Sequence, residues 1–315
     1  MALNGLPNVV VLVGGVGGAK LAHGLAQVLP PDKLTVIVNT GDDMWYYGLR
    51  ICPDLDTVMY TLAGVVDKAK GWGLSDDTTR MLDGLRRYGE EAWFGLGDQD
   101  VATHLLRTQA LRAGETLTQV TARLSRALGV QTRVVPMTDA QVATLVDTAE
   151  YGEIEFQEYF VRYRWQPTVR AIRFAGIETA SVSETVRLAL ERADVILIGP
   201  SNPWLSILPI LSVPGMRDLL MSRTVPRIAV SPIVEGRAIK GPAAKIMAEL
   251  GYTVSARTVV EFYGDLLTGF VYDKRDADLH IEELPTAMFD TVMHVEADRM
   301  LLAREIIDWT LGKTT

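Results

Sequence analysis

The chain has 315 residues, of which 48% are hydrophobic and 22% are charged, and this composition is typical of soluble globular proteins. Its formal net charge of −8 argues against a general nucleic-acid-binding surface. The sequence has no apolar run of about 18 residues that could cross a membrane, no recognisable secretory signal and only one cysteine, Cys52, so we expect a cytoplasmic protein without a disulfide framework.

The first predicted unit is a strand, a glycine-rich turn, a helix and a second strand. Residues 8–13 form a short apolar run that leads into four glycines, and apolar residues then recur at helical spacing over 19–29. Pro30 and Pro31 end this helix, and residues 34–38 form a second buried strand. Such a unit predicts a parallel sheet with a right-handed crossover.

Further along the chain, residues 75–128 are rich in Leu, Arg, Ala and Thr at helical spacing and read as a helical insertion. Extended segments are expected at 134–135 and 153–164, buried strands at 195–198 and 227–230, and a loop at 273–285. Helices are expected at 183–192, 215–222, 241–250 and 297–311. The sequence therefore predicts a single α/β domain over 1–315, a Rossmann-like parallel sheet with a helical insertion at approximately 75–128.

The glycine loop is the first motif that points to chemistry. Because it follows a strand and opens a helix, its N–H groups and the helix dipole suit a phosphate. The standard dinucleotide and P-loop patterns both fail here, since the first needs a glycine at Lys20 and the second needs Gly-Lys-Ser/Thr. A tight turn that serves packing alone is the alternative. The candidate residues are Gly14, Gly15, Gly17, Gly18 and Lys20.

An acidic cluster follows the second strand. Asp42 and Asp43 come directly after that strand, and Asp54 and Asp56 follow eleven and thirteen residues after Asp43. Ligands of open α/β sheets bind beyond the carboxyl ends of the strands, so the first pair should lie beside the glycine loop. Carboxylates near a phosphate require a hard cation, and Mg²⁺ prefers oxygen ligands. The alternative is that Asp54 or Asp56 caps a helix.

Two further groups of polar residues lie in loops or on one helix. Trp72, Asp98, His104 and Arg107 combine a glycine-flanked aromatic ring with polar side chains, although an ordinary solvated helix would also explain His104 and Arg107. The second group follows strands or opens a helix, where small polar residues can bind a nucleotide, or simply form turns. This group comprises Ser201, Asn202, Ser206, Ser231 and Gly241.

Together these motifs resemble the 2-phospho-L-lactate transferase family of coenzyme F-420 biosynthesis. A related family of sugar-nucleotide-binding regulatory proteins usually has Gly-Ser-Ser-Gly after the acidic pair, whereas here Met44-Trp45-Tyr46-Tyr47 follows it. The resemblance covers nearly the whole chain. Besides the motifs above it includes Gly71-Trp72-Gly73, Leu96-Gly97-Asp98, Pro136-Met137-Thr138-Asp139, Phe156-Gln157-Glu158, Gly199-Pro200-Ser201-Asn202-Pro203, Ser231-Pro232-Ile233 and Gly241-Pro242-Ala243.

The resemblance implies a modified Rossmann core and the transfer of a phospho-acid from a guanosine diphosphate ester to the ribityl hydroxyl of the deazaflavin Fo, with release of GMP. The glycine loop, Asn39 and the group from Ser201 to Gly241 would bind the nucleotide. Asp43, Asp54 and Asp56 would hold Mg²⁺ and supply catalytic carboxylates. Trp72, Asp98, His104 and Arg107 would frame the deazaflavin.

The donor acid is left open between phospholactate, phosphoenolpyruvate and phosphoglycerate. A homodimer is a further expectation, as is the absence of nucleic-acid and membrane partners. The alternative function is a non-catalytic nucleotide-binding regulator on the same fold.

Overall fold

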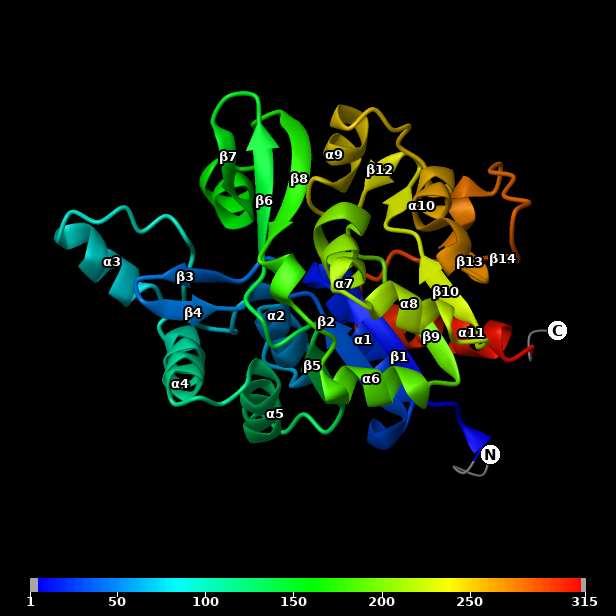
Figure 1. Ribbon diagram of the computed structural model, residues 1–315, viewed down its shortest axis with the longest axis horizontal. Helices are drawn as coiled ribbons and strands as arrows, with labels where there is room; N and C mark the ends of the chain where they lie inside the picture. Colours follow the sequence, from blue (N-terminus) through cyan, green and yellow to red (C-terminus); the bar gives the residue numbers. More distant parts are fainter. Residues whose placement is uncertain (1–4, 313–315) are drawn as a thin grey trace.

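The computed structural model describes residues 5–312 and is built around a seven-stranded parallel sheet (Figure 1). All neighbouring strands in this sheet run parallel. None of the helices within these residues is long and apolar enough to span a bilayer. The strands lie in the order β14 (Thr286–Phe289), β13 (Gly269–Asp273), β10 (Arg227–Val230), β9 (Val195–Ile198), β1 (Val9–Val13), β2 (Leu34–Val38) and β5 (Arg133–Pro136).

The strand order reverses between β1 and β9. From β1 the chain adds β2 and β5 on one side, and from β9 it adds β10, β13 and β14 on the other. This is the order of a Rossmann-like sheet, in which ligands bind at the carboxyl ends of the two strands at the reversal. The sequence analysis predicted this fold class, and the structure confirms it.

Both faces of the sheet are covered, which explains why its strands are apolar throughout. Val9, Val11 and Val13 of β1 pack in one core, whereas Val10 and Leu12 pack in the other. The first core lies under α1 (Gly15–Val28), α2 (Pro53–Leu62), α5 (Leu117–Ala127) and α11 (Glu296–Thr310). The second lies under α6 (Glu184–Glu191), α7 (Leu208–Ser212), α8 (Met216–Met221), α9 (Ala243–Glu249) and α10 (Ala256–Tyr263).

The helices predicted at 183–192, 215–222, 241–250 and 297–311 are confirmed as α6, α8, α9 and α11, within two residues at each end. Helix α1 was expected at Ala19 but begins at Gly15, so the glycine loop forms the first turn of the helix. The predicted loop at 273–285 holds only one 3-10 turn, Lys274–Asp276.

A second, antiparallel sheet was missed. It contains β7 (Gly152–Glu155), β6 (Ala143–Thr148) and β8 (Val169–Ala175), which lie above the main sheet in Figure 1. The prediction that 153–164 is extended was wrong beyond Glu155, because the chain there turns into a π-helix, Glu158–Arg162. In β6 only alternate residues are buried, so the strand lacks the continuous apolar run of the central strands.

The segment 75–128 contains α3 (Arg80–Arg87), α4 (Asp100–Arg112) and α5. A hairpin of β3 (Met44–Tyr46) and β4 (Leu49–Ile51) packs with α3 in a small hydrophobic cluster of its own, and this part projects from the sheet in Figure 1. The description of 1–315 as a single domain with an insertion at approximately 75–128 stays a prediction.

Two helical glycines test the packing of α1 against α11. A Cβ at Gly24 would collide with the backbone carbonyl of Arg299, whereas a Cβ at Gly84, in α3, would meet nothing. We expect Gly24→Ala to lower the free energy of unfolding by about 2–3 kcal/mol through overpacking. Gly84→Ala should raise it by about 0.5–1 kcal/mol through helix propensity. Urea denaturation of both variants measures these changes, and equal values would contradict the assigned α1–α11 contact.

Candidate active site

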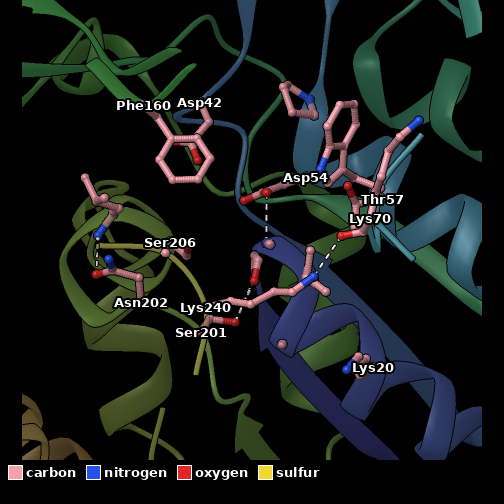
Figure 2. Close-up of a pocket in the computed structure, with 18 of the residues that line it drawn as sticks. Lys20, Asp42, Asp54, Thr57, Lys70, Phe160, Ser201, Asn202, Ser206 and Lys240 are labelled. Carbon is pink, nitrogen blue, oxygen red and sulfur yellow. Dashed lines mark hydrogen bonds between the residues drawn. The ribbon is translucent and has the colours of Figure 1, made fainter. Parts of the chain in front are cut away.

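A cavity of about 550 Å³ lies at the carboxyl ends of β1 and β9 (Figure 2). Its walls come from the start of α1, the loop after β2, the start of α2, the loop after β9 and the segment around Lys240. The cavity size is ordinary for a small-molecule site. Its position is the one that the reversal of strand order predicts.

The glycine loop is held in place by the loop after β9. The Ser201 hydroxyl accepts a hydrogen bond from the Gly14 N–H (3.0 Å) and donates one to the Gly14 carbonyl (2.8 Å). A Cβ at Gly17 would lie 2.5 Å from the Pro200 carbonyl oxygen, and one at Gly18 would lie 2.5 Å from the Ser201 hydroxyl. These glycines therefore permit close packing between two loops, as the alternative interpretation proposed.

Gly15 differs from the other glycines of the loop. Its φ is +62°, which side chains rarely allow, and an added Cβ would meet nothing within 4 Å. Gly15, Val16 and Gly17 line the cavity at the start of α1. The first-turn N–H groups of a helix have no partner within it, so this surface remains suited to an anion.

Asp42 and Asp54 form the acidic wall of the cavity. Asp54 accepts hydrogen bonds from the Gly15 N–H (2.8 Å) and the Asn39 side-chain amide (3.0 Å). Burial raises the pKa of Asp54 to about 6. Burial, together with the charge of Asp54, also raises the pKa of Asp42, whose Oδ1 is buried without a hydrogen-bond partner. Burial disfavours the charged forms of these two carboxylates, and a bound cation would stabilise both of them.

The structure places the other predicted metal ligands differently. Asp43 does not line the cavity; its Oδ2 lies 3.3 Å from Nη2 of Arg50, and burial raises its pKa to about 6. Asp56 lines the cavity, but both of its carboxylate oxygens accept hydrogen bonds from Arg107. Asp54 and Asp56 lie inside the first turn of α2 and neither is its N-cap residue, which is Cys52, so the capping alternative was wrong.

A buried polar network continues from Asp56 along α4. Nη1 of Arg107 lies 3.2 Å from Nδ1 of His104, and Nε2 of His104 lies 3.3 Å from Oδ1 of Asp100. The Tyr60 hydroxyl donates a 2.5 Å hydrogen bond to the same Asp100 oxygen. Asp56, Asp100 and His104 bring ligand atoms within 4.8 Å of one another and form a buried group that could hold a metal ion. Neither Asp100 nor Tyr60 was among the predicted site residues.

Lysines line the cavity beside the glycine loop. Lys20 donates to the Met293 carbonyl (2.6 Å), and Lys240 donates to the Lys70 carbonyl (2.7 Å), a contact drawn in Figure 2. Burial, followed by the nearby charges of Arg299 and Lys240, lowers the pKa of Lys20. The cavity therefore combines an acidic wall with the positive charges of Lys20, Lys70 and Lys240. Lys70 was missed because it lies in a loop without a recognisable motif.

The remaining predicted residues divide into two groups. Trp72, Asn202, Ser206, Ser231 and Gly241 line the cavity, whereas Gly18, Asn39, Asp98 and Arg107 do not. Some of these residues have a structural role as well. Asn202 accepts hydrogen bonds from the Trp204 and Leu205 N–H groups, and Ser231 bonds within its own turn. Asp98 accepts hydrogen bonds from the N–H groups of Arg80 and Met81 at the start of α3.

An apolar wall was also missed as part of the site. Phe156 and Phe160 stack with their ring centroids 5.4 Å apart, and both line the cavity with Phe94 and Leu205. The motif Phe156-Gln157-Glu158 was noted in the sequence, but nothing there indicated that it faces the same space as the glycine loop. The π-helix that follows β7 brings Phe160 to this wall.

The profile of the family described as 2-phospho-L-lactate transferase CofD matches residues 9–308. The chain belongs to this family. It is therefore a transferase of coenzyme F-420 biosynthesis, as its motifs predicted, and not a non-catalytic regulator.

Relatives named as transferases align over most of the chain. This chain is 43% identical over 267 residues to the 2-phospho-L-lactate transferase of Methanosarcina mazei. The alignment covers 85% of this chain and 87% of that protein. It is 45% identical over 275 residues to the phosphoenolpyruvate transferase of Streptomyces coelicolor, covering 86% of each. A phosphoenolpyruvate transferase of Thermobifida fusca is 43% identical over 300 residues, covering 90% of this chain and 92% of that protein.

A solved structure supports the fold independently. A crystal structure of a protein from Bacillus halodurans superposes with a TM-score of 0.63 at 17% identity, covering 97% of this chain and 99% of that chain. A second crystal structure from the same organism, described as a member of the UPF0052 family, has a TM-score of 0.61 at 15% identity and covers 96% of this chain and 99% of that chain. At this identity the likeness concerns the fold alone.

Two arginines of α4 test the buried network. Arg107 is fully buried and bonded to Asp56, whereas Arg112 is exposed and donates to the Gly48 carbonyl. Arg107→Ala leaves a buried carboxylate without its partner, so we expect the free energy of unfolding to fall by about 3–5 kcal/mol. Arg112→Ala should change it by about 0.5 kcal/mol or less. Chemical denaturation distinguishes the two, and a small loss for Arg107→Ala would contradict the buried ion pair.

Proposed function

We propose that this protein transfers the phospho-acid portion of a guanosine diphosphate ester to the ribityl hydroxyl of the deazaflavin Fo. The hydroxyl oxygen attacks the phosphorus that bears the acid, the bond between this phosphorus and the bridging oxygen breaks, and GMP leaves. The observation that carries the proposal is one cavity in which a helix N-terminus and three lysines adjoin a pair of buried carboxylates and an aromatic wall.

The protein's own contribution to this reaction is positioning and charge stabilisation. Phosphoryl transfer of this kind needs little covalent chemistry from the enzyme. We assign the diphosphate to the start of α1, where the N–H groups and the charges of Lys20, Lys70 and Lys240 offset its negative charge. The proton of the attacking hydroxyl needs an acceptor, and the carboxylates of Asp42, Asp54 and Asp100 all line the cavity.

The residues at the acidic wall fit Mg²⁺. Asp42 and Asp54 offer only oxygen ligands, and Oδ1 of Asp42 is buried without a partner. The group of Asp56, Asp100 and His104 fits less well, because Arg107 occupies both oxygens of Asp56 and His104 supplies nitrogen. We therefore assign Mg²⁺ to Asp42 and Asp54 rather than to Asp43, Asp54 and Asp56. When bound there, the ion would neutralise charge on the diphosphate.

The relatives named as 2-phospho-L-lactate transferase and as phosphoenolpyruvate transferases are 43% and 43–45% identical to this chain, so sequence identity favours neither phospholactate nor phosphoenolpyruvate as the donor acid.

The deazaflavin is assigned to the part of the cavity lined by Trp72, Phe94 and His104, where aromatic rings can cover a flat ligand. A homodimer and a cytoplasmic location remain predictions.

The direct test is product analysis. Purified protein is incubated with Fo, Mg²⁺ and each of the three candidate donors, and the products are identified by mass spectrometry. We expect one donor to give a phosphodiester of Fo together with an equal amount of GMP. Binding of Fo without conversion by any donor would contradict the proposed reaction.

The raised pKa values of the acidic wall make Mg²⁺ binding dependent on pH. Because the folded pKa of Asp54 lies near 6 and its ordinary value near 4, protonation at this site stabilises the metal-free protein below about pH 4. That contribution is lost as the pH rises to about 6. Mg²⁺ must displace the protons, so we expect its affinity to be about 10-fold weaker at pH 5 than at pH 7. Calorimetric titration in buffers of different ionisation enthalpy measures the released protons.

The position of the Mg²⁺ site is tested with the matched variants Asp54→Asn and Asp43→Asn. Both carboxyls are buried with a pKa raised to about 6, but only Asp54 lines the cavity. We expect Asp54→Asn to abolish the Mg²⁺-dependent rise in melting temperature and nearly all turnover, whereas Asp43→Asn keeps the rise. Loss of the rise in Asp43→Asn, with the rise kept in Asp54→Asn, would show that Asp43 binds the metal instead.

Two glycines with a positive φ test the role of the start of α1. Gly15 and Gly64 both have a positive φ and open space where a Cβ would project, but Gly64 does not line the cavity. Alanine at either position should cost about 1 kcal/mol of stability through the left-handed backbone. Only Gly15→Ala should also weaken GDP binding, by about 10-fold or more, because its methyl group occupies the phosphate position. Equal GDP affinity in the two variants would contradict the assignment of the diphosphate to this loop.

A further inference from the structure

We propose that Arg107 is a positioning residue that keeps the His104 ring proton on Nε2, and that His104 and Asp100 then act as a donor–acceptor pair. This pair would recognise a carbonyl group next to an N–H group on the acceptor ring. The inference rests on the proposed function, because it concerns how the deazaflavin is bound. It changes the expected role of Arg107, from a residue that touches the ring to one that acts through its neighbours.

Arg107 is not placed to touch a ligand. Its exposed fraction is 0%, and it does not line the cavity. Both terminal nitrogens donate to Asp56, and Nη1 also lies 3.4 Å from the Arg50 carbonyl oxygen. The guanidinium is therefore fixed by protein groups alone.

The contact with Arg107 determines which nitrogen of His104 carries the proton. A guanidinium has only donors, so Nδ1 of His104, at 3.2 Å from Nη1 of Arg107, must be the acceptor. A proton on Nδ1 would point at those donors, and the nearest oxygen of Asp56 lies farther away, at 3.6 Å. In the neutral ring the proton therefore sits on Nε2.

The Nε2–H group that results has no hydrogen-bond partner, although His104 is 1% exposed and lines the cavity. Oδ1 of Asp100 is close, at 3.3 Å, but Nε2 and this oxygen are not aligned as a hydrogen bond, and the same oxygen accepts the Tyr60 hydroxyl. A buried donor without a partner is costly and calls for an explanation. A ligand carbonyl in the cavity would satisfy it.

Asp100 supplies the complementary acceptor. Its side chain lines the cavity beside His104, and a carboxylate offers two oxygens, of which Tyr60 uses only one. The pyrimidinedione edge of a deazaflavin presents an N–H group between two carbonyl groups. Asp100 can accept from that N–H while His104 donates to a neighbouring carbonyl. Trp72 and Phe94 line the same cavity and can cover a ring face.

Two substitutions of His104 distinguish a role as a hydrogen-bond donor at Nε2 from a role that only fills space. The amide nitrogen of glutamine reaches the place of Nε2, whereas that of asparagine reaches the place of Nδ1. Fo is titrated by its fluorescence and GDP is titrated separately as the control ligand. We expect His104→Gln to bind Fo within about 3-fold of the unchanged protein, and His104→Asn to bind it about 10-fold more weakly, which corresponds to one lost hydrogen bond.

The role of Arg107 is tested with lysine, which keeps the charge but not the paired donors. Arg107→Lys should weaken Fo binding by about 10-fold, while Arg112→Lys on the same helix should leave it unchanged. The ¹⁵N spectrum of the His104 imidazole provides a second readout. We expect the Nε2–H form in the unchanged protein and a mixture of both neutral forms in Arg107→Lys.

A ligand analogue tests the recognised edge directly. Fo methylated at the N–H of its pyrimidinedione cannot donate to Asp100, so it should bind about 10-fold or more weaker than Fo. Equal affinities for Fo and the methylated analogue, or a His104 proton found on Nδ1, would overturn the inference. If the unchanged protein binds Fo but forms no product with any donor, the proposed function fails instead.

Discussion

The two hydrogen bonds between the Ser201 hydroxyl and the backbone of Gly14 join the two strands at which the sheet order reverses. This junction brings the start of α1 within contact of the loop after β9, and both loops approach so closely that only glycine fits at Gly17 and Gly18. The Gly15 N–H then reaches Asp54, so the phosphate-suited helix end and the acidic wall share one hydrogen bond.

The cavity contains both acidic and basic side chains, and this accounts for how a chain of net charge −8 would bind the proposed diphosphate donor. Asp42 and Asp54 are buried where their negative charges are unfavourable, as their raised pKa values indicate. Lys20, Lys70 and Lys240 lie along the same cavity, on the side of the glycine loop. A diphosphate and a divalent cation would each find complementary charge there, although the surface as a whole repels anions.

The network along α4 has a different character, because its strongest charges face each other and not the cavity. Arg107 and Asp56 neutralise one another, and the geometry of this pair orients His104 toward Asp100. Buried ion pairs contribute little net stability compared with apolar residues of similar volume, but they restrict neighbouring groups to one arrangement. Such restriction suits the proposed recognition of a flat heterocycle by the pattern of its donors and acceptors.

The sequence alone determined the local features of this protein. Continuous apolar runs identified β1, β2, β9 and β10 because strands covered on both faces leave no polar positions. The order of its motifs also indicated the family, and three of the residues that those motifs singled out, Asp54, Ser201 and His104, line one cavity.

Only the tertiary structure decided which side chain of each motif faces the cavity. Asp42 and Asp43 are adjacent in the chain, and the direction of the backbone after β2 turns Asp42 into the cavity and Asp43 toward Arg50. His104 and Arg107 share one helical face, yet Arg107 bonds to Asp56, fifty-one residues earlier in the chain, and only His104 reaches the cavity. Spacing along the chain predicts which residues share an element, but the burial and charge of side chains depend on partners from elements distant in sequence.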